Sequence, residues 1–173
     1  QEDTHSFEPD DQAILPKKIL VVGGGPAGLE AARTAALRGH RVSLHEATKS
    51  LGGQLVYARQ APHRADLGLI IDYLVSELNS LEVDISINSL VDEDVIADIA
   101  PDEIILATGS TPRTDGFQVA FPVEPVPGCH LPHVHTSWDV FSKHIVSGFS
   151  GDAVVFDDIG TFEAISVADV LLA

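Results

Sequence analysis

Three glycines near the start of the chain have the spacing of a phosphate-binding turn. Gly23, Gly25 and Gly28 form the pattern G-x-G-x-x-G directly after the apolar run Lys18 to Val22. In a strand–turn–helix, the first glycine makes a tight turn, the second lets the backbone approach a pyrophosphate, and the third lets helix and strand pack closely. Amides at the start of the helix then meet the phosphate charge. A glycine-rich turn without a ligand is the competing interpretation, and the flanking strand and helix favour a dinucleotide.

An acidic residue stands where such a fold contacts a ribose. Glu46 lies 18 residues after Gly28 and directly follows Arg41 to His45, whose alternating pattern predicts a strand. A carboxylate there accepts hydrogen bonds from an adenosine ribose and repels a 2′-phosphate, so this position disfavours NADP. A solvated charge at a strand end is the alternative.

Short apolar strands alternate with amphipathic helices along the chain. This pattern predicts βαβ units and an α/β, Rossmann-like, doubly wound parallel sheet. The expected strands are 18–22, 41–45, 83–87 and a buried strand at 104–107, and the expected helices are 29–38, 66–81 and 137–145. A second strand–turn–helix is expected from Val154 onward.

The composition excludes several other kinds of function. The 173 residues carry a net charge of −16, which repels a phosphate backbone and argues against nucleic acid as a partner. The apolar runs are far shorter than the roughly 20 residues of a membrane-spanning helix. The single cysteine, Cys129, leaves no disulfide framework and fits a cytoplasmic protein. It lies near His130, His133 and His135, but their spacing matches no zinc pattern, so no metal site is expected.

The glycine turn, Glu46 and the segment Leu51 to Gln54 together resemble the FAD-binding start of the two-dinucleotide-binding-domain flavoproteins. Ile104 to Arg113 is similar to the second flavin motif of that group, in which a strand ends in Ala-Thr-Gly beneath the nucleotide. The resemblance implies that Gly53 and Gln54 contact the phosphates. With the motif residues, the candidate cofactor contacts are Gly23, Gly25, Pro26, Ala27, Gly28, Glu46, Ala47, Gly53, Gln54, Ala107, Thr108, Gly109 and Arg113.

A narrower resemblance covers nearly all of the chain, from about Lys17 to Ala173. Gly53 to Leu55, Ala58 to Pro62 and the pair Pro112-Arg113 look like the C-terminal portion of iron–sulfur flavoenzymes of the NADH:flavin oxidoreductase family, related to dienoyl-CoA reductase, trimethylamine dehydrogenase and histamine dehydrogenase. In that group an FMN-bearing barrel and a 4Fe-4S cluster precede this region. The resemblance implies non-covalent FAD in the first site, with ADP as the alternative. Substrate would be oxidised at the barrel, so no catalytic residue is expected here and the fragment alone is expected to be inactive.

The second strand–turn–helix departs from this group. In the reductases it carries its own glycine fingerprint and holds NAD(P)H, but here Asp157, Ile159 and Phe162 occupy the three glycine positions. Adjacent carboxylates at Asp157 and Asp158 repel a pyrophosphate, and the bulky side chains block a close backbone approach. This loss resembles the amine dehydrogenases, which pass electrons to a protein acceptor.

The expected organisation has three parts. Residues 1–16 are a linker from an upstream region, 17–150 are the FAD-binding domain, and 151–173 are the truncated start of a degenerate NAD(P)-binding-like domain. The expected partners are an adenine nucleotide, the upstream FMN barrel of the same protein and an electron-transfer protein.

Overall fold

The computed structural model describes residues 12–142 and 151–172. Most of the expected linker 1–16 and the end of the expected helix 137–145 lie outside the described residues. The chain divides into two compact units: unit 1 comprises 1–53 and 69–109, and unit 2 comprises 54–68 and 110–173. The expected boundary between residues 150 and 151 stays a prediction.

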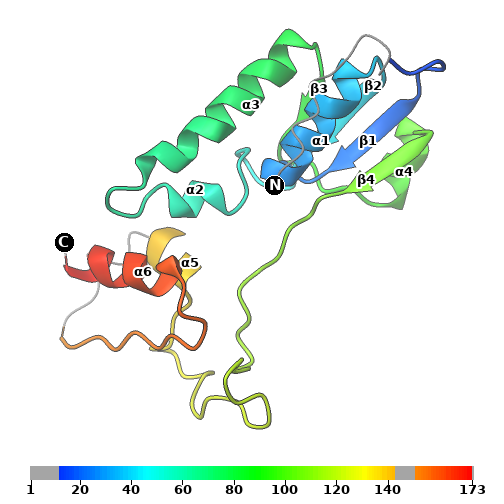
Figure 1. The fold of residues 1–173 in the computed structure, drawn as a ribbon. Coiled ribbons are helices and arrows are strands. Elements are labelled where there is room, and N and C mark those ends of the chain that lie inside the picture. The colour runs from blue at the N-terminus through cyan, green and yellow to red at the C-terminus, as the bar shows by residue number, and fades with distance from the viewer. Residues whose placement is uncertain (1–11, 143–150, 173) are drawn as a thin grey trace. The chain divides into compact units, whose positions relative to one another are not determined.

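Unit 1 contains a four-stranded parallel sheet with the strand order β3-β2-β1-β4 (Figure 1). The strands are β1 (Lys18–Val22), β2 (Arg41–His45), β3 (Asp84–Ser86) and β4 (Glu103–Leu106). Val22 pairs with His45 on one side and with Leu106 on the other. The carboxyl ends of β1, β2 and β4 therefore meet at one edge, which is where ligands bind in open α/β sheets. The predicted parallel sheet is confirmed.

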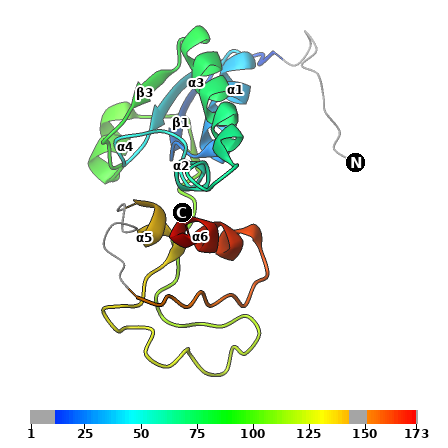
Figure 2. The same ribbon diagram turned by 90° about the vertical axis from the view of Figure 1, so that its left-hand side faces the viewer.

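Helices α1 (Pro26–Leu37) and α3 (Leu69–Ser80) pack side by side in unit 1, as Figures 1 and 2 show. Leu29 of α1 and Leu78 of α3 are fully buried, together with Leu20 of β1. Pro26 suits the first helical position because the amide it lacks would have no partner inside the helix. Gly39 follows the helix with φ +86°, a left-handed conformation that is typical of the residue after a helix C-cap.

The fourth strand corrects one sequence prediction. We expected 104–107 to be a buried strand, but β4 lies at the edge of the described sheet, and Leu106 is 76% exposed. An edge strand has a neighbour on one side only, and its apolar sequence does not reveal how much of it other elements cover.

Unit 2 is built from short helices around a small apolar core. Its helices are α2 (Leu55–Ala58), η2 (Ala65–Gly68), α5 (Ser137–Ser142) and α6 (Phe162–Leu172). The core consists of Ala61, Val140, Phe141 and Val167. Tyr57 stacks against Trp138 with ring centroids 4.8 Å apart.

The expected strand from Val154 to Phe156 does not form. These residues have no strand hydrogen bonding in the described part of unit 2, and Val154 is 93% exposed. A strand needs a neighbour to satisfy its backbone groups, and unit 2 provides none among the described residues. The helix expected after the strand is present as α6.

The structure contains a helix that the sequence analysis does not predict, α4 (Glu93–Ile99). Asp92 is the N-cap of this helix, and its Oδ1 accepts a hydrogen bond of 3.0 Å from the amide of Val95. An aspartate one position before a helical segment is a typical N-cap signal, so it could have revealed the helix.

Replacing Asp92 tests this cap. Asp92→Ala should destabilise the protein by about 1 kcal/mol, because the amide of Val95 loses its acceptor. Asp98→Ala, in the same helix but away from its first turn, is the matched control and should leave the stability nearly unchanged. Urea denaturation of both variants measures the difference, and equal unfolding midpoints would contradict the capping role.

Candidate nucleotide-binding site

Two of the three motif glycines are required by the packing of unit 1. Gly23 has φ +108°, and a Cβ there would lie 2.3 Å from the carbonyl oxygen of Ala107. A Cβ on Gly28 would lie 1.8 Å from the carbonyl oxygen of Gly23. Neither position can carry a side chain, because α1 and the carboxyl ends of β1 and β4 approach each other through bare backbone.

Gly25 is different, because the protein itself leaves room for a side chain there. Its φ of −75° is open to any residue, and the nearest heavy atom to an added Cβ would be the Cα of Gly53 at 3.8 Å. The fold alone therefore does not demand glycine. The free space above this backbone, at the carboxyl edge of the sheet, fits a ligand that approaches the main chain closely.

The start of α1 offers amides to that space. Among the described residues, the amides of Gly25, Ala27 and Gly28 donate to no acceptor in the protein, and the first intrahelical bond runs from Leu29 to Gly25. The first turn of this 12-residue helix carries no acidic residue. Free amides and the positive end of the helix dipole favour an anion, so the residues fit a diphosphate.

Glu46 lies beside the glycine turn and contacts it directly. Its Oε2 accepts a hydrogen bond of 2.7 Å from the amide of Gly24, and its Oε1 accepts one of 2.8 Å from the amide of Thr48. The residue is only 9% exposed. Burial raises the pKa of this carboxyl, but the hydrogen bonds from Thr48 and Gly24 outweigh burial, so the pKa lies below its ordinary value. Glu46 is thus ionised at neutral pH and still has lone pairs for a further donor.

A second glycine loop supports the first. The amide of Gly52 donates to the carbonyl oxygen of Gly24 over 2.8 Å, and Leu51 packs so closely that a Cβ on Gly24 would lie 2.5 Å from its Cδ2. Gly53 has φ +52°, and an added Cβ would lie 3.0 Å from the Cα of Gly25. The two loops therefore meet backbone to backbone. The sequence reasoning missed Gly24 and Gly52, although three consecutive glycines at 23–25 were a signal.

The remaining site residues fall into two groups. Ala107 packs against Gly23 and Gly28, whereas Ala47, Thr108 and Gly109 are exposed. Unit 1 thus brings together Gly23, Gly25, Pro26, Ala27, Gly28, Glu46, Ala47, Gly53, Ala107, Thr108 and Gly109.

Gln54 and Arg113 belong to unit 2, so unit 1 does not itself contain them. The side-chain amide of Gln54 donates to the hydroxyl of Ser110 over 2.8 Å. Arg113 pairs with Asp115, and its guanidinium lies 4.2 Å from the ring centre of Phe117. Their predicted contacts with phosphate stay predictions.

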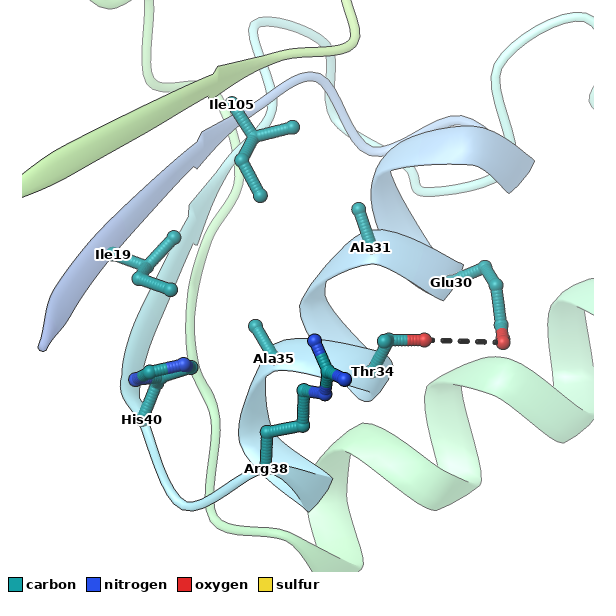
Figure 3. Close-up of a pocket in the computed structure, with 8 residues that line it drawn as sticks. All are labelled: Ile19, Glu30, Ala31, Thr34, Ala35, Arg38, His40 and Ile105. Carbon is teal, nitrogen blue, oxygen red and sulfur yellow. Dashed lines mark hydrogen bonds between the residues drawn. The ribbon is translucent and has the colours of Figure 1, made fainter. Parts of the chain in front are cut away.

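A hollow of about 350 Å³ lies elsewhere in unit 1, between α1 and strands β1 and β4 (Figure 3). It is lined by Ile19, Glu30, Ala31, Thr34, Ala35, Arg38, His40 and Ile105. Part of the hollow lies toward the amino ends of the strands, because its lining includes Ile19, near the start of β1, and His40, just before β2. Because ligands of open α/β sheets bind at the opposite edge, this hollow is not the nucleotide site.

Two other features of the described residues bear on the kind of site. Within 12–142 and 151–172, no three His, Cys, Asp or Glu side chains lie together in a way that could hold a metal ion. In the same ranges, no helix has the length and apolarity needed to cross a membrane.

Residues 17–137 match the model of the family described as pyridine nucleotide-disulphide oxidoreductase. The chain belongs to this family. The match covers both glycine loops, Glu46 and the Ala107 to Gly109 turn. The chain is therefore an FAD/NAD-binding domain of the kind found in flavin-dependent oxidoreductases.

Individual relatives confirm the narrower resemblance. The N,N-dimethylglycine/sarcosine dehydrogenase of Chromohalobacter salexigens is 37% identical over an alignment 173 residues long. The alignment covers 96% of this chain and 23% of that protein. The structure of 6-hydroxypseudooxynicotine amine oxidase from Pseudomonas geniculata aligns with a TM-score of 0.80 and 38% identity, over 90% of this chain and 23% of that one. Histamine dehydrogenase from a Rhizobium species aligns with a TM-score of 0.62 and 34% identity, over 67% of this chain and 18% of that one. These relatives are oxidoreductases, and the chain spans less than a quarter of their length.

Because Gly28 and Gly25 have different roles, replacing each of them by alanine should have a different effect. Gly28→Ala should destabilise the fold by about 3 kcal/mol or more, because its Cβ would overlap the carbonyl of Gly23. Gly25→Ala should leave the stability within about 1 kcal/mol of the wild type and weaken ADP binding at least about tenfold, because its methyl fills the space for the ligand. Urea denaturation and calorimetric titration measure the two effects. Wild-type affinity in Gly25→Ala would contradict this placement of the diphosphate.

The lowered pKa of Glu46 predicts a pH dependence of stability. Its stabilising effect is complete above the ordinary pKa of 4.5 and is lost as the pH falls through the lower pKa of the folded state. Glu46→Gln should therefore lose less free energy of unfolding than the wild type between about pH 6 and about pH 3. Urea denaturation across that range measures the difference, and parallel pH profiles would contradict it.

Proposed function

We propose that this chain is the FAD-binding segment of a flavin-dependent oxidoreductase and holds the cofactor without a covalent bond. The observation that carries the proposal is the free space over Gly25, bordered by the unpaired amides of Ala27 and Gly28. These amides bind the diphosphate, and Glu46 accepts a hydrogen bond from the adenosine ribose. Bound FAD supplies the redox chemistry, while the residues named here bind and orient it.

ADP is a second candidate ligand, and one observation favours it. Unit 1 provides a glycine turn that fits a diphosphate and a carboxylate, Glu46, that fits a ribose. ADP contains both of these groups. In that case the domain is a structural or docking module of an enzyme resembling the amine dehydrogenases.

The proposal includes the loss of the NAD(P)H site in the segment that precedes α6, where the sequence predicts a second strand–turn–helix. Oδ1 of Asp157 accepts hydrogen bonds from the amide of Ile159 over 3.0 Å and from the amide of Gly160 over 2.9 Å. The backbone donors that a glycine loop offers to a pyrophosphate are thus engaged by the protein's own carboxylate. This supports a parent enzyme that passes electrons to a protein acceptor.

The activity of the whole protein is also a proposal. Three relatives are by name a dimethylglycine/sarcosine dehydrogenase, an amine oxidase and a histamine dehydrogenase, so we infer an amine as the substrate class. An FMN barrel and a 4Fe-4S cluster in the parent would carry out the oxidation, in line with the narrower resemblance. The single cysteine of this chain agrees with a cytoplasmic location.

The nucleotide content of the purified parent protein tests the proposal. Denaturation should release an adenine nucleotide in a 1:1 ratio to the chain, and chromatography should identify it as FAD; ADP would favour the second candidate. Once ADP saturates the first site, titration of the 173-residue chain with NADH and NADPH should give no further saturable binding, because the second site is lost. Release of no adenine nucleotide, together with a chain that binds neither FAD nor ADP, would contradict the proposal.

A further inference from the structure

We propose that Glu46 is also a positioning residue for the diphosphate loop, because it fixes the peptide group of Gly24 and so determines where the next amides point. This inference rests on the proposed nucleotide site and deepens it. It goes beyond a ribose contact, since it makes the affinity for the diphosphate depend on Glu46 even when the ligand offers no ribose hydroxyl.

The first step is that Glu46 is held rigidly. Its amide donates to the carbonyl oxygen of Ser86 over 2.8 Å, and its carbonyl oxygen accepts from the amide of Ser89 over 2.9 Å. Both backbone groups of Glu46 are therefore tied to the end of β3 and the residues after it. Its side chain is buried and bonded to Gly24 and Thr48, so the carboxylate has little freedom to move toward a ligand.

The second step concerns the peptide group that joins Gly23 to Gly24. Its N–H donates to Glu46, and its carbonyl oxygen, on Gly23, lies on the opposite side against Gly28. In a planar trans peptide these two groups point in opposite directions, so one hydrogen bond orients the whole unit. The contact with Glu46 thus also determines where the carbonyl of Gly23 faces α1.

The third step concerns the next peptide group, between Gly24 and Gly25. Its carbonyl oxygen accepts the amide of Gly52, so its N–H, which belongs to Gly25, points away from the second loop. A Cβ on Gly24 would lie 2.5 Å from the Cδ2 of Leu51 and 3.1 Å from the Cβ of Glu46, so a side chain there would displace one of these two side chains. Glu46 and Gly52 therefore hold two successive peptide groups, and the orientation of the Gly25 amide follows from them.

Removing the carboxylate has a cost at the loop itself. Gly24 is buried, so its amide would lose its acceptor inside the protein, and the peptide would rotate to find another. That rotation would move the amides that face the ligand. A carboxylate that served the ribose alone would leave these amides where they are.

Two nucleotides separate these roles: ADP, and 2′,3′-dideoxy-ADP, which lacks the ribose hydroxyls that a carboxylate can bind. Calorimetric titration of the 173-residue chain compares the wild type with Glu46→Gln. We expect Glu46→Gln to weaken 2′,3′-dideoxy-ADP at least about tenfold, because its single carboxamide oxygen cannot accept from both the Gly24 and the Thr48 amides, and its NH2 group then faces an N–H. The matched control is Glu103→Gln, an exposed strand glutamate paired with Lys17, which should change neither affinity more than about twofold.

Each outcome decides between the hypotheses. If Glu46→Gln weakens ADP but not 2′,3′-dideoxy-ADP, the carboxylate acts through the ribose alone, and the positioning role is wrong while the proposed function stands. If the wild type binds neither nucleotide, the proposed function fails. If Glu46→Gln does not fold, hydrogen exchange in the wild type decides. The Gly24 amide should be protected more strongly than the amides of Gly25 and Ala27, and equal rates would overturn the inference.

Discussion

The structure of unit 1 depends on backbone groups that approach one another without side chains between them. A Cβ on Gly23 or Gly28 would overlap backbone atoms, and a Cβ on Gly24 would contact the side chains of Leu51 and Glu46. Among the four glycines of this turn, Gly25 alone has free space beside it. The turn is therefore tightly packed on the side that faces the sheet and open at Gly25, and such preorganisation favours binding through main-chain amides.

The distribution of charged side chains around the glycine turn also bears on what this turn can bind. The whole chain carries a net charge of −16, yet the first turn of α1 contains no carboxylate, and the carboxylate of Glu46 is bonded to two backbone amides. The local field at the start of α1 thus favours an anion in spite of the overall charge. In the turn before α6, by contrast, the amides of Ile159 and Gly160 donate to the side chain of Asp157, so the chain's own carboxylate supplies the anion there.

The sequence predicts best what short-range patterns determine. Strands β1 and β2 have the predicted bounds because hydrophobic alternation and the glycine turn mark both ends. The exposure of Leu106 and the absence of a strand at Val154 depend on which neighbours are present, and no local pattern encodes that. Likewise, Glu46 could be predicted as a ligand from its spacing, but its bond to Gly24 requires knowing that Leu51 and Gly52 close the other side of the loop.

The central claim is that amides at the start of α1 bind a diphosphate, and amide chemical shifts in ¹⁵N-labelled protein during an ADP titration test it most directly. The amides of Gly25, Ala27 and Gly28 should move together and saturate with one dissociation constant. Shifts confined to other residues, such as Arg38 and His40 in the hollow beside α1, or no saturable shift at all, would contradict the claim.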